Sequence, residues 1–262
     1  MRGGAPYRAV LLVAAAAVFL AIGFLGGRLA QSASSGSSAA ATATLDVPGI
    51  ESIVAQYIHN HPETIVAALD AERARHALQG QYAVSAAIQA HRAELFADSA
   101  SPTMGNPQGD VDVAEFFDFR CPYCKSTAPL LENLAARDRH VRIVLKNLPI
   151  LGADSMYAAH LGLAAAKIGR FTDFYKAVFA NVPAHGDRTA IDGAVRSIGF
   201  DPAALYARSR TPEIEALVKR DLQLAGALGI AGTPALVVGD QLLAEAPTLG
   251  TLQAAVAAAR RR

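Results

Sequence analysis

Cys121 and Cys124 are the only two cysteines among the 262 residues of the chain, and two residues separate them. The apolar segment before them, residues 111–120, predicts a buried strand, and the segment after them predicts a helix. A Cys-x-x-Cys motif between a strand and a helix is typical of a redox site. A zinc ribbon would need a second pair of ligands, and the chain has no second cysteine pair. The motif therefore favours redox chemistry, and we expect no bound metal and no cofactor.

The segments that follow the motif alternate between strand and helix patterns. A second strand is predicted at residues 141–146, and a mainly helical stretch at about 152–229. Residues 235–238 and 242–243 flank Gly239 and Asp240, a hairpin signal, and a closing helix follows. This order predicts an α/β domain over residues 109–262 whose sheet is split in sequence by an all-helical insertion. A loop at residues 99–110 marks its start.

The N-terminus predicts export. Arg2 and Arg8 precede an unbroken apolar run at residues 9–25, which is the arrangement of a signal peptide or a signal-anchor helix. We expect residues 1–30 to stay uncleaved, with residues 9–30 in the inner membrane and the remainder in the periplasm or on the extracytoplasmic face. The alternative is a cleaved signal peptide and a soluble periplasmic protein. In either case the cysteines reach an oxidising compartment.

A helical arm is predicted between the N-terminal segment and the α/β domain. Residues 31–48 are rich in Ser, Ala and Thr and form a flexible tether, and residues 49–98 form the arm. Pro62 interrupts the arm and starts its second helix. The arm is either an oligomerisation element or a solvated helix that packs on its own domain. A net charge of +1 without a basic stripe argues against nucleic acid as a partner.

The two cysteines are expected to have different roles. Cys121 is predicted to cap the helix, with Pro122 at the first helical position, where its missing N–H costs nothing. A helix N-terminus stabilises a thiolate. We therefore expect Cys121 to be an exposed, attacking thiol and Cys124, one turn inside the helix, to be the resolving thiol. A static disulfide is the alternative.

Two further segments bear on the dithiol. Glu115 lies in the apolar strand, where burial raises the pKa of a carboxyl and lets it exchange protons with a thiol. Asp118 is closer in sequence, and we expect it to be a solvated carboxylate at the sheet edge. Thr233 and Pro234 follow Gly232 just before a strand, and a cis-proline opposite a dithiol would leave backbone free to pair with an extended substrate.

The segments EFFDFRCPYCK, at residues 115–125, and GTPA, at residues 232–235, together resemble the DsbA family of exported thiol:disulfide interchange proteins. The resemblance implies a thioredoxin-like fold with an inserted helical domain and a proline, Pro129, that kinks the active-site helix. It implies that Cys121 is the nucleophile, that Cys124 is the resolving thiol and that Glu115 is a buried proton-transfer acid. It also makes Pro234 the cis-proline and Thr233 a contact for bound peptide. Lys146 is expected to neighbour the buried acid.

Within this family, the helical extension resembles that of the ScsC-like proteins tied to copper tolerance, in which the extension can oligomerise and favours isomerase behaviour. The oxidase DsbA has His where this chain has Tyr123, so we expect a less strongly oxidising dithiol. The sequence thus predicts an exported oxidoreductase that forms or reshuffles disulfides in protein clients, with oxidation placed ahead of isomerisation. Its expected partners are exported proteins with thiols or disulfides, a membrane redox partner that resets the dithiol, and further copies of the chain bound through residues 49–98. A membrane-tethered copper-binding protein and a redox sensor are the alternatives.

Overall fold

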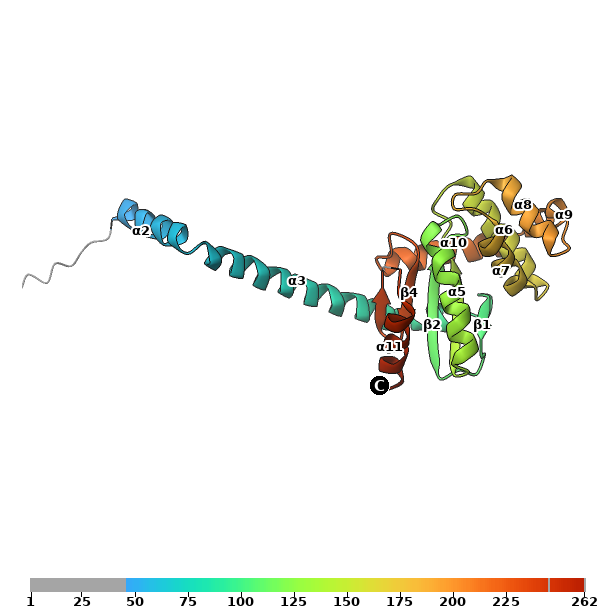
Figure 1. Ribbon diagram of the computed structural model, residues 1–262, viewed down its shortest axis with the longest axis horizontal. Coiled ribbons are helices and arrows are strands. Elements are labelled where there is room, and N and C mark those ends of the chain that lie inside the picture. Colours follow the sequence, from blue (N-terminus) through green and yellow to red (C-terminus); the bar gives the residue numbers. More distant parts are fainter. Residues whose placement is uncertain (1–45, 245, 262) are drawn as a thin grey trace, which may run out of the picture. The chain divides into compact units, whose positions relative to one another are not determined.

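The computed structural model describes residues 46–244 and 246–261 (Figure 1). The predicted signal or anchor segment, residues 1–30, lies outside the described residues, as does most of the predicted tether. Within the part that is described, no helix is long and apolar enough to cross a bilayer. The chain divides into two compact units, Met1–Ala68 and Leu69–Arg262.

The described part of the first unit is helical. Helix α2 (Val47–Asn60) is capped by Asp46, whose carboxylate accepts a hydrogen bond from the backbone N–H of Gly49 at 3.1 Å. Helix α3 (Pro62–Ala90) starts at Pro62, so the predicted break between the two arm helices is confirmed. In the described chain, none of the side chains of α2 is buried. The apolar face of this helix is therefore open to solvent.

The second unit contains a five-stranded mixed sheet with the strand order β1-β3-β2-β4-β5. The strands are β1 (Thr103–Gly105), β2 (Val111–Phe117), β3 (Val141–Asn147), β4 (Ala235–Val238) and β5 (Gln241–Leu243). Strands β2 and β3 are parallel and joined by helix α5 (Pro122–Arg137), and the other neighbouring pairs are antiparallel. The predicted hairpin is β4–β5, where Gly239 has a φ of 60°. Strand β1 falls inside the predicted loop at 99–110, because three residues are too few to show an alternating pattern.

The alternation of side chains along β2 gives the sheet two buried faces. Val113 and Phe117 belong to a core shared with α5 and with α11 (Leu249–Arg260), and both helices lie over the strands in Figure 1. Ala114 and Phe116 belong to a second core, formed with the end of α3, with α4 (Arg92–Phe96) and with α10 (Pro212–Ala227). Burial on both faces explains why β2 reads as a nearly continuous apolar run. It also explains why the compact unit begins within α3 and not at the loop at 99–110.

The predicted helical insertion consists of five helices between β3 and β4. They are α6 (Ala153–Lys167), α7 (Phe171–Asn181), α8 (Arg188–Ser197), α9 (Pro202–Ser209) and α10. Asp187, Asp201 and Thr211 cap the last three helices with their side-chain oxygens. Helices α6 to α9 gather beyond one end of the sheet (Figure 1). That end is also where β2 runs into the cysteine motif.

Candidate active site

The cysteine motif lies where β2 ends and α5 begins. Cys121 is the N-cap of α5 in an extended conformation, and Pro122 occupies the first turn, so the predicted cap is confirmed. The backbone N–H of Cys121 donates to the carbonyl of Asp118 at 3.1 Å, which closes the turn between strand and helix. Pro129 lies inside α5. The local sequence thus places the first sulfur at the positive end of a helix dipole.

The two thiols, both free, have opposite electrostatic environments. The pKa of Cys121 is lowered to about 5, chiefly by a hydrogen bond from Cys124, with further contributions from Thr233 and from the backbone N–H groups of Cys124 and Tyr123. The pKa of Cys124 is raised, chiefly because this side chain is completely buried. At neutral pH, Cys121 is therefore a thiolate and Cys124 a thiol.

Cys121 is covered by the loop before β4. Its residue exposure is only 5 %, so the expectation of an exposed thiol was wrong. Sγ of Cys121 lies 3.2 Å from the carbonyl oxygen of Thr233, to which it can donate a hydrogen bond in its protonated form. The Thr233–Pro234 peptide bond is cis, the isomer that the family resemblance implies. Tyr123, by contrast, is 64 % exposed beside the covered sulfur.

Glu115 is buried completely on the α5 side of the sheet. The hydroxyl of Tyr175, on α7, donates to its Oε2 at 2.9 Å, whereas Oε1 has no hydrogen-bond partner among the described residues. The pKa of Glu115 is raised to about 8, chiefly by burial and also by the charge on Cys121, while the hydrogen bond from Tyr175 lowers it. The carboxyl can therefore hold a proton near neutral pH.

Asp118 is not the solvated carboxylate that we expected. It is 1 % exposed, and its Oδ1 and Oδ2 accept hydrogen bonds from the backbone N–H groups of Arg120 and Leu151 at 2.8 and 3.0 Å. Because the strand ends at Phe117, Asp118 turns inward to cap the loop and does not continue the alternation. Its role in the geometry is to hold the turn that leads to Cys121.

Arg120 ties the same turn to the segments around the helical insertion. Its guanidinium donates to the carbonyls of Gly186, Leu151 and His185 at 2.8, 2.8 and 2.9 Å. In return, the backbone N–H of His185 donates to the carbonyl of Arg120. The cysteine motif is thereby fixed from its N-terminal side by one aspartate and one arginine.

Lys146 does not neighbour Glu115, and that expectation was wrong. In the parallel register, Glu115 lies opposite Leu145 and Phe116 lies opposite Lys146, so Lys146 points to the other face of the sheet. There its ammonium donates to the carbonyl of Glu94 at 2.8 Å and to the hydroxyl of Ser101 at 2.7 Å. It also forms ion pairs with two carboxylates, those of Asp98 and Asp221, at 3.3 and 3.6 Å.

The sequence assigned no role, or the wrong role, to three residues of the site: Tyr175, Asp118 and Arg120. Tyr175 is 60 positions from Glu115 and belongs to an apolar aromatic helix whose pattern predicts only core packing. Asp118 and Arg120 lie beside the motif, but their partners come from the far side of β3 and from the insertion. A local signal existed only in the position of Asp118, directly after the strand, where an Asx turn is common.

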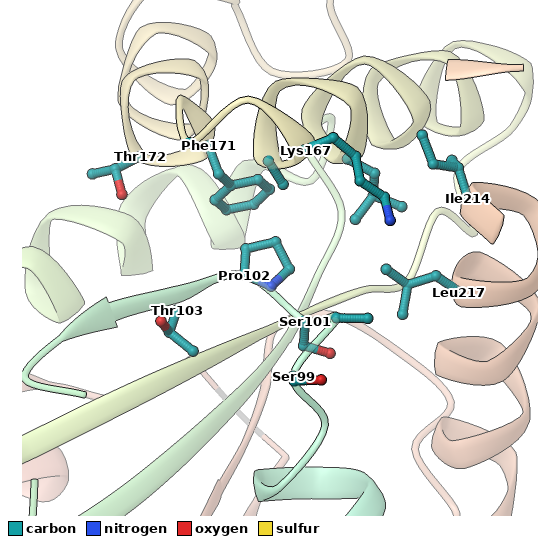
Figure 2. Close-up of a pocket in the computed structure, with 13 residues that line it drawn as sticks. Ser99, Ser101, Pro102, Thr103, Lys167, Phe171, Thr172, Ile214 and Leu217 are labelled. Atoms are coloured by element: carbon teal, nitrogen blue, oxygen red, sulfur yellow. The ribbon is translucent and has the colours of Figure 1, made fainter. Parts of the chain in front are cut away.

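A separate cavity of about 340 Å³ lies between the loop at 99–103 and helices α6, α7 and α10. Figure 2 shows Phe171, Pro102 and Leu217 around it, with Lys167 at its margin. Its lining includes neither cysteine and neither residue of the Thr233–Pro234 turn. Among residues 46–244 and 246–261, no three His, Cys, Asp or Glu side chains are grouped so that they could hold a metal ion.

The chain is similar to known proteins both in its sequence and in its structure. The chain matches the DSBA-like thioredoxin domain over residues 112–257. It is 28 % identical over 164 residues to the thiol:disulfide interchange protein DsbA of Bordetella parapertussis, covering 60 % of this chain and 77 % of that protein.

Two crystal structures extend this similarity. A thioredoxin-like oxidoreductase from Silicibacter pomeroyi is 37 % identical, with a TM-score of 0.63 over 65 % of this chain and 98 % of that one. Proteus mirabilis ScsC in a transitional conformation is 26 % identical, with a TM-score of 0.61 over 84 % of this chain and 98 % of that one. A family match over more than half of the chain, on a thioredoxin-like sheet with a helical insertion and a Cys-x-x-Cys helix start, identifies this chain as a member of the DsbA-like thioredoxin-domain family.

Proposed function

We propose that this chain is a protein-disulfide oxidoreductase that forms or reshuffles disulfides in client proteins through a mixed disulfide at Cys121. The observation that carries the proposal is the opposite shift of the two thiol pKa values, down to about 5 for Cys121 and upward for Cys124. A thiolate is both the better nucleophile and the better leaving group of the pair. Only one of the two sulfurs is therefore prepared for exchange with a client.

In the oxidising direction, a client thiolate attacks Sγ of Cys121 in the Cys121–Cys124 disulfide. That bond breaks, Cys124 leaves as a thiolate and takes up a proton, and a mixed disulfide joins the client to Cys121. A second client thiolate then attacks the client sulfur of the mixed disulfide. The client disulfide forms, Cys121 leaves as a thiolate, and two electrons have passed from the client to the dithiol. A redox partner must remove these electrons before the next cycle.

The remaining site residues have supporting roles in this proposal. Glu115 supplies and removes the proton of Cys124, since a carboxyl with a pKa of about 8 can do both near neutral pH. Thr233 and Pro234 contact the extended client segment beside Cys121, because the carbonyl of Thr233 already lies against its sulfur. Pro122 sets the start of α5, and the exposed ring of Tyr123 is available to the client.

The proposal places this chemistry outside the cytoplasm, where disulfides persist. Arg2 and Arg8, ahead of the apolar run at residues 9–25, support export and an anchor at residues 9–30. The clients are then exported proteins that contain thiols or disulfides, and the partner that resets the dithiol is membrane-bound.

We also propose that copies of the chain associate through the arm, residues 49–98. The support is an apolar face on α2, made by Ile50, Ile53, Val54, Tyr57 and Ile58, all of them exposed in the single chain. Two or more dithiols in one assembly could hold a client while its disulfides are reshuffled. Association of copies therefore favours isomerisation in addition to oxidation.

Refolding assays separate the two activities and test the proposal. The purified exported region is mixed with a reduced client and, separately, with a client whose disulfides are scrambled, and its reduction potential is measured. An oxidase acts on the first client and an isomerase on the second, and Cys121→Ser abolishes both. A potential well below that of the glutathione pool, with no activity on either client, would contradict the proposal. An Ile53→Glu variant on α2 tests the arm, because it should yield monomers and lose only isomerisation.

A further inference from the structure

Tyr175 holds the buried carboxyl of the site from the helical insertion. Its hydroxyl donates to Oε2 of Glu115 at 2.9 Å, and both side chains are inaccessible to solvent. The ring of Tyr175 packs against those of Phe117, Phe119 and Phe179, with ring centroids 5.5, 6.2 and 4.7 Å away. Packing on several sides restricts the ring to one orientation. The hydroxyl is therefore aimed at Glu115 by the aromatic core.

We propose that Tyr175 is a positioning residue for proton transfer at the dithiol. It holds Oε2 of Glu115 and stabilises the carboxylate form, so that Oε1 is left to exchange a proton with Cys124. This inference rests on the proposed function, since it concerns the proton that Cys124 gains or loses there. It assigns a chemical role in the thioredoxin-like site to a residue of the inserted helices.

The groups around Glu115 explain why such a donor is needed. Cys121 and Cys124, at the start of α5, interact electrostatically with Glu115, and Tyr175 on α7 donates to it. Its neighbours in the sheet are Leu145 on β3 and Leu236 on β4. The Cys121 thiolate opposes the ionisation of Glu115, and so does burial. The hydrogen bond from the Tyr175 hydroxyl favours the carboxylate. Lys146, which could have done so, lies on the other face of the sheet.

The proton balance follows from this arrangement. When Cys124 attacks the mixed disulfide, its proton passes to the Glu115 carboxylate, the Cys121–Cys124 bond forms and the client leaves as a thiolate. In the reverse direction, protonated Glu115 returns the proton to the departing Cys124 thiolate. Tyr175 keeps its own proton throughout, because burial raises its pKa well above the ordinary value. It remains a hydrogen-bond donor in both directions and is not consumed.

Tyr175→Phe tests the proposal, because it keeps the packed ring and removes only the hydroxyl. The rate at which Cys124 resolves a mixed disulfide between Cys121 and a synthetic cysteine peptide is measured in single turnover across pH. We expect the midpoint of the pH–rate profile to rise by about one unit and the rate below it to fall about tenfold, since a hydrogen bond to a charged group has about this effect. Tyr157→Phe is the matched control. It removes a hydroxyl that donates to Asp192 at 2.7 Å in the same insertion, and it should leave the profile unchanged.

Glu115→Gln separates this inference from the proposed function. Glu115→Gln should remove the midpoint from the pH–rate profile. Adding Tyr175→Phe to Glu115→Gln should then leave the profile unchanged. If Tyr175→Phe gives the wild-type profile while Glu115→Gln alters it, the role of Tyr175 is refuted and the proposed function stands. If the wild type forms no mixed disulfide at Cys121, the proposed function itself fails.

Should Tyr175→Phe not fold, the wild type provides the test by NMR. The carbon-13 shift of the hydroxyl-bearing ring carbon of Tyr175 should follow the titration of the Glu115 carboxyl with the same midpoint. A Tyr175 carbon-13 shift that stays constant through the titration of Glu115 would refute the inference.

Discussion

Replacing Glu115 by Gln is expected to stabilise the folded protein at alkaline pH and to have little effect at acidic pH. Burial raises the pKa of Glu115 from 4.5 to about 8, so the folded state binds this proton more tightly than the unfolded state does. The resulting stability is complete below pH 4.5 and is lost as the pH rises through 8. At about 1.36 kcal/mol per pKa unit, the loss in the free energy of unfolding approaches about 5 kcal/mol. Local relaxation around the charge reduces it to about 3–5 kcal/mol.

Gln cannot ionise but can still accept the hydrogen bond from Tyr175, so the variant avoids this loss. The free energy of unfolding is measured with denaturant at about pH 4 and about pH 9, on both sides of the titration. The Glu115→Gln change is introduced into a Cys121→Ala, Cys124→Ala background, so that no thiol titrates, and burial, the largest cause of the raised pKa of Glu115, is retained there. Glu51→Gln, at an exposed position on α2, is the control. It should change the free energy of unfolding by the same amount at both pH values. If Glu115→Gln changes the free energy of unfolding by the same amount at both pH values, the reasoning is refuted.

Three further predictions concern the two thiols, Arg120 and Lys146. The alkylation rate of Cys121 should be constant near neutral pH and fall only as the pH drops through about 5, since its pKa is lowered, while Cys124 stays unmodified in the folded protein. Arg120→Met should lower the free energy of unfolding by about 2–3 kcal/mol, because partly exposed hydrogen bonds to three carbonyls are lost, and thermal melting checks this. Lys146→Met should lower the free energy of unfolding by about 3–5 kcal/mol, because it removes the ion-pair partner of the buried Asp221 carboxylate, whereas Asp98 keeps Arg220; adding Asp221→Leu should restore part of that stability in urea unfolding.

Features that depend on neighbouring residues could be predicted from the sequence. The break at Pro62, the helix start at Cys121 and the hairpin at Gly239 each follow from one or two residues with a strong conformational preference. The order of elements also followed, because strand and helix periodicities are local. Strand β1 was missed because it has no local pattern of its own. It is stabilised by its pairing with β3.

Features that depend on register and on distant segments could not be predicted. A shift of one position between β2 and β3 decides whether Lys146 meets Glu115 or faces away from it, and no local pattern encodes that choice. The cover over Cys121 comes from Thr233, 112 positions away. Asp118 was misjudged because its partner, the backbone of Leu151, lies beyond the next strand. The two cysteines were recognisable, but the groups that set their chemistry were assembled by the fold.

The buried ammonium of Lys146 has a consequence for how this domain can be exchanged between proteins. Its partners Glu94, Asp98 and Ser101 all precede residue 112, where the match to the family domain begins. Ile88 also precedes it and fills the core on that same face of the sheet. A transplant cut at residue 112 would remove these three partners, leave Lys146 with Asp221 as its ion-pair partner, and leave an apolar face bare. The unit that evolution or a protein engineer can move intact is therefore longer than the unit that relatives share, and it includes the end of the arm.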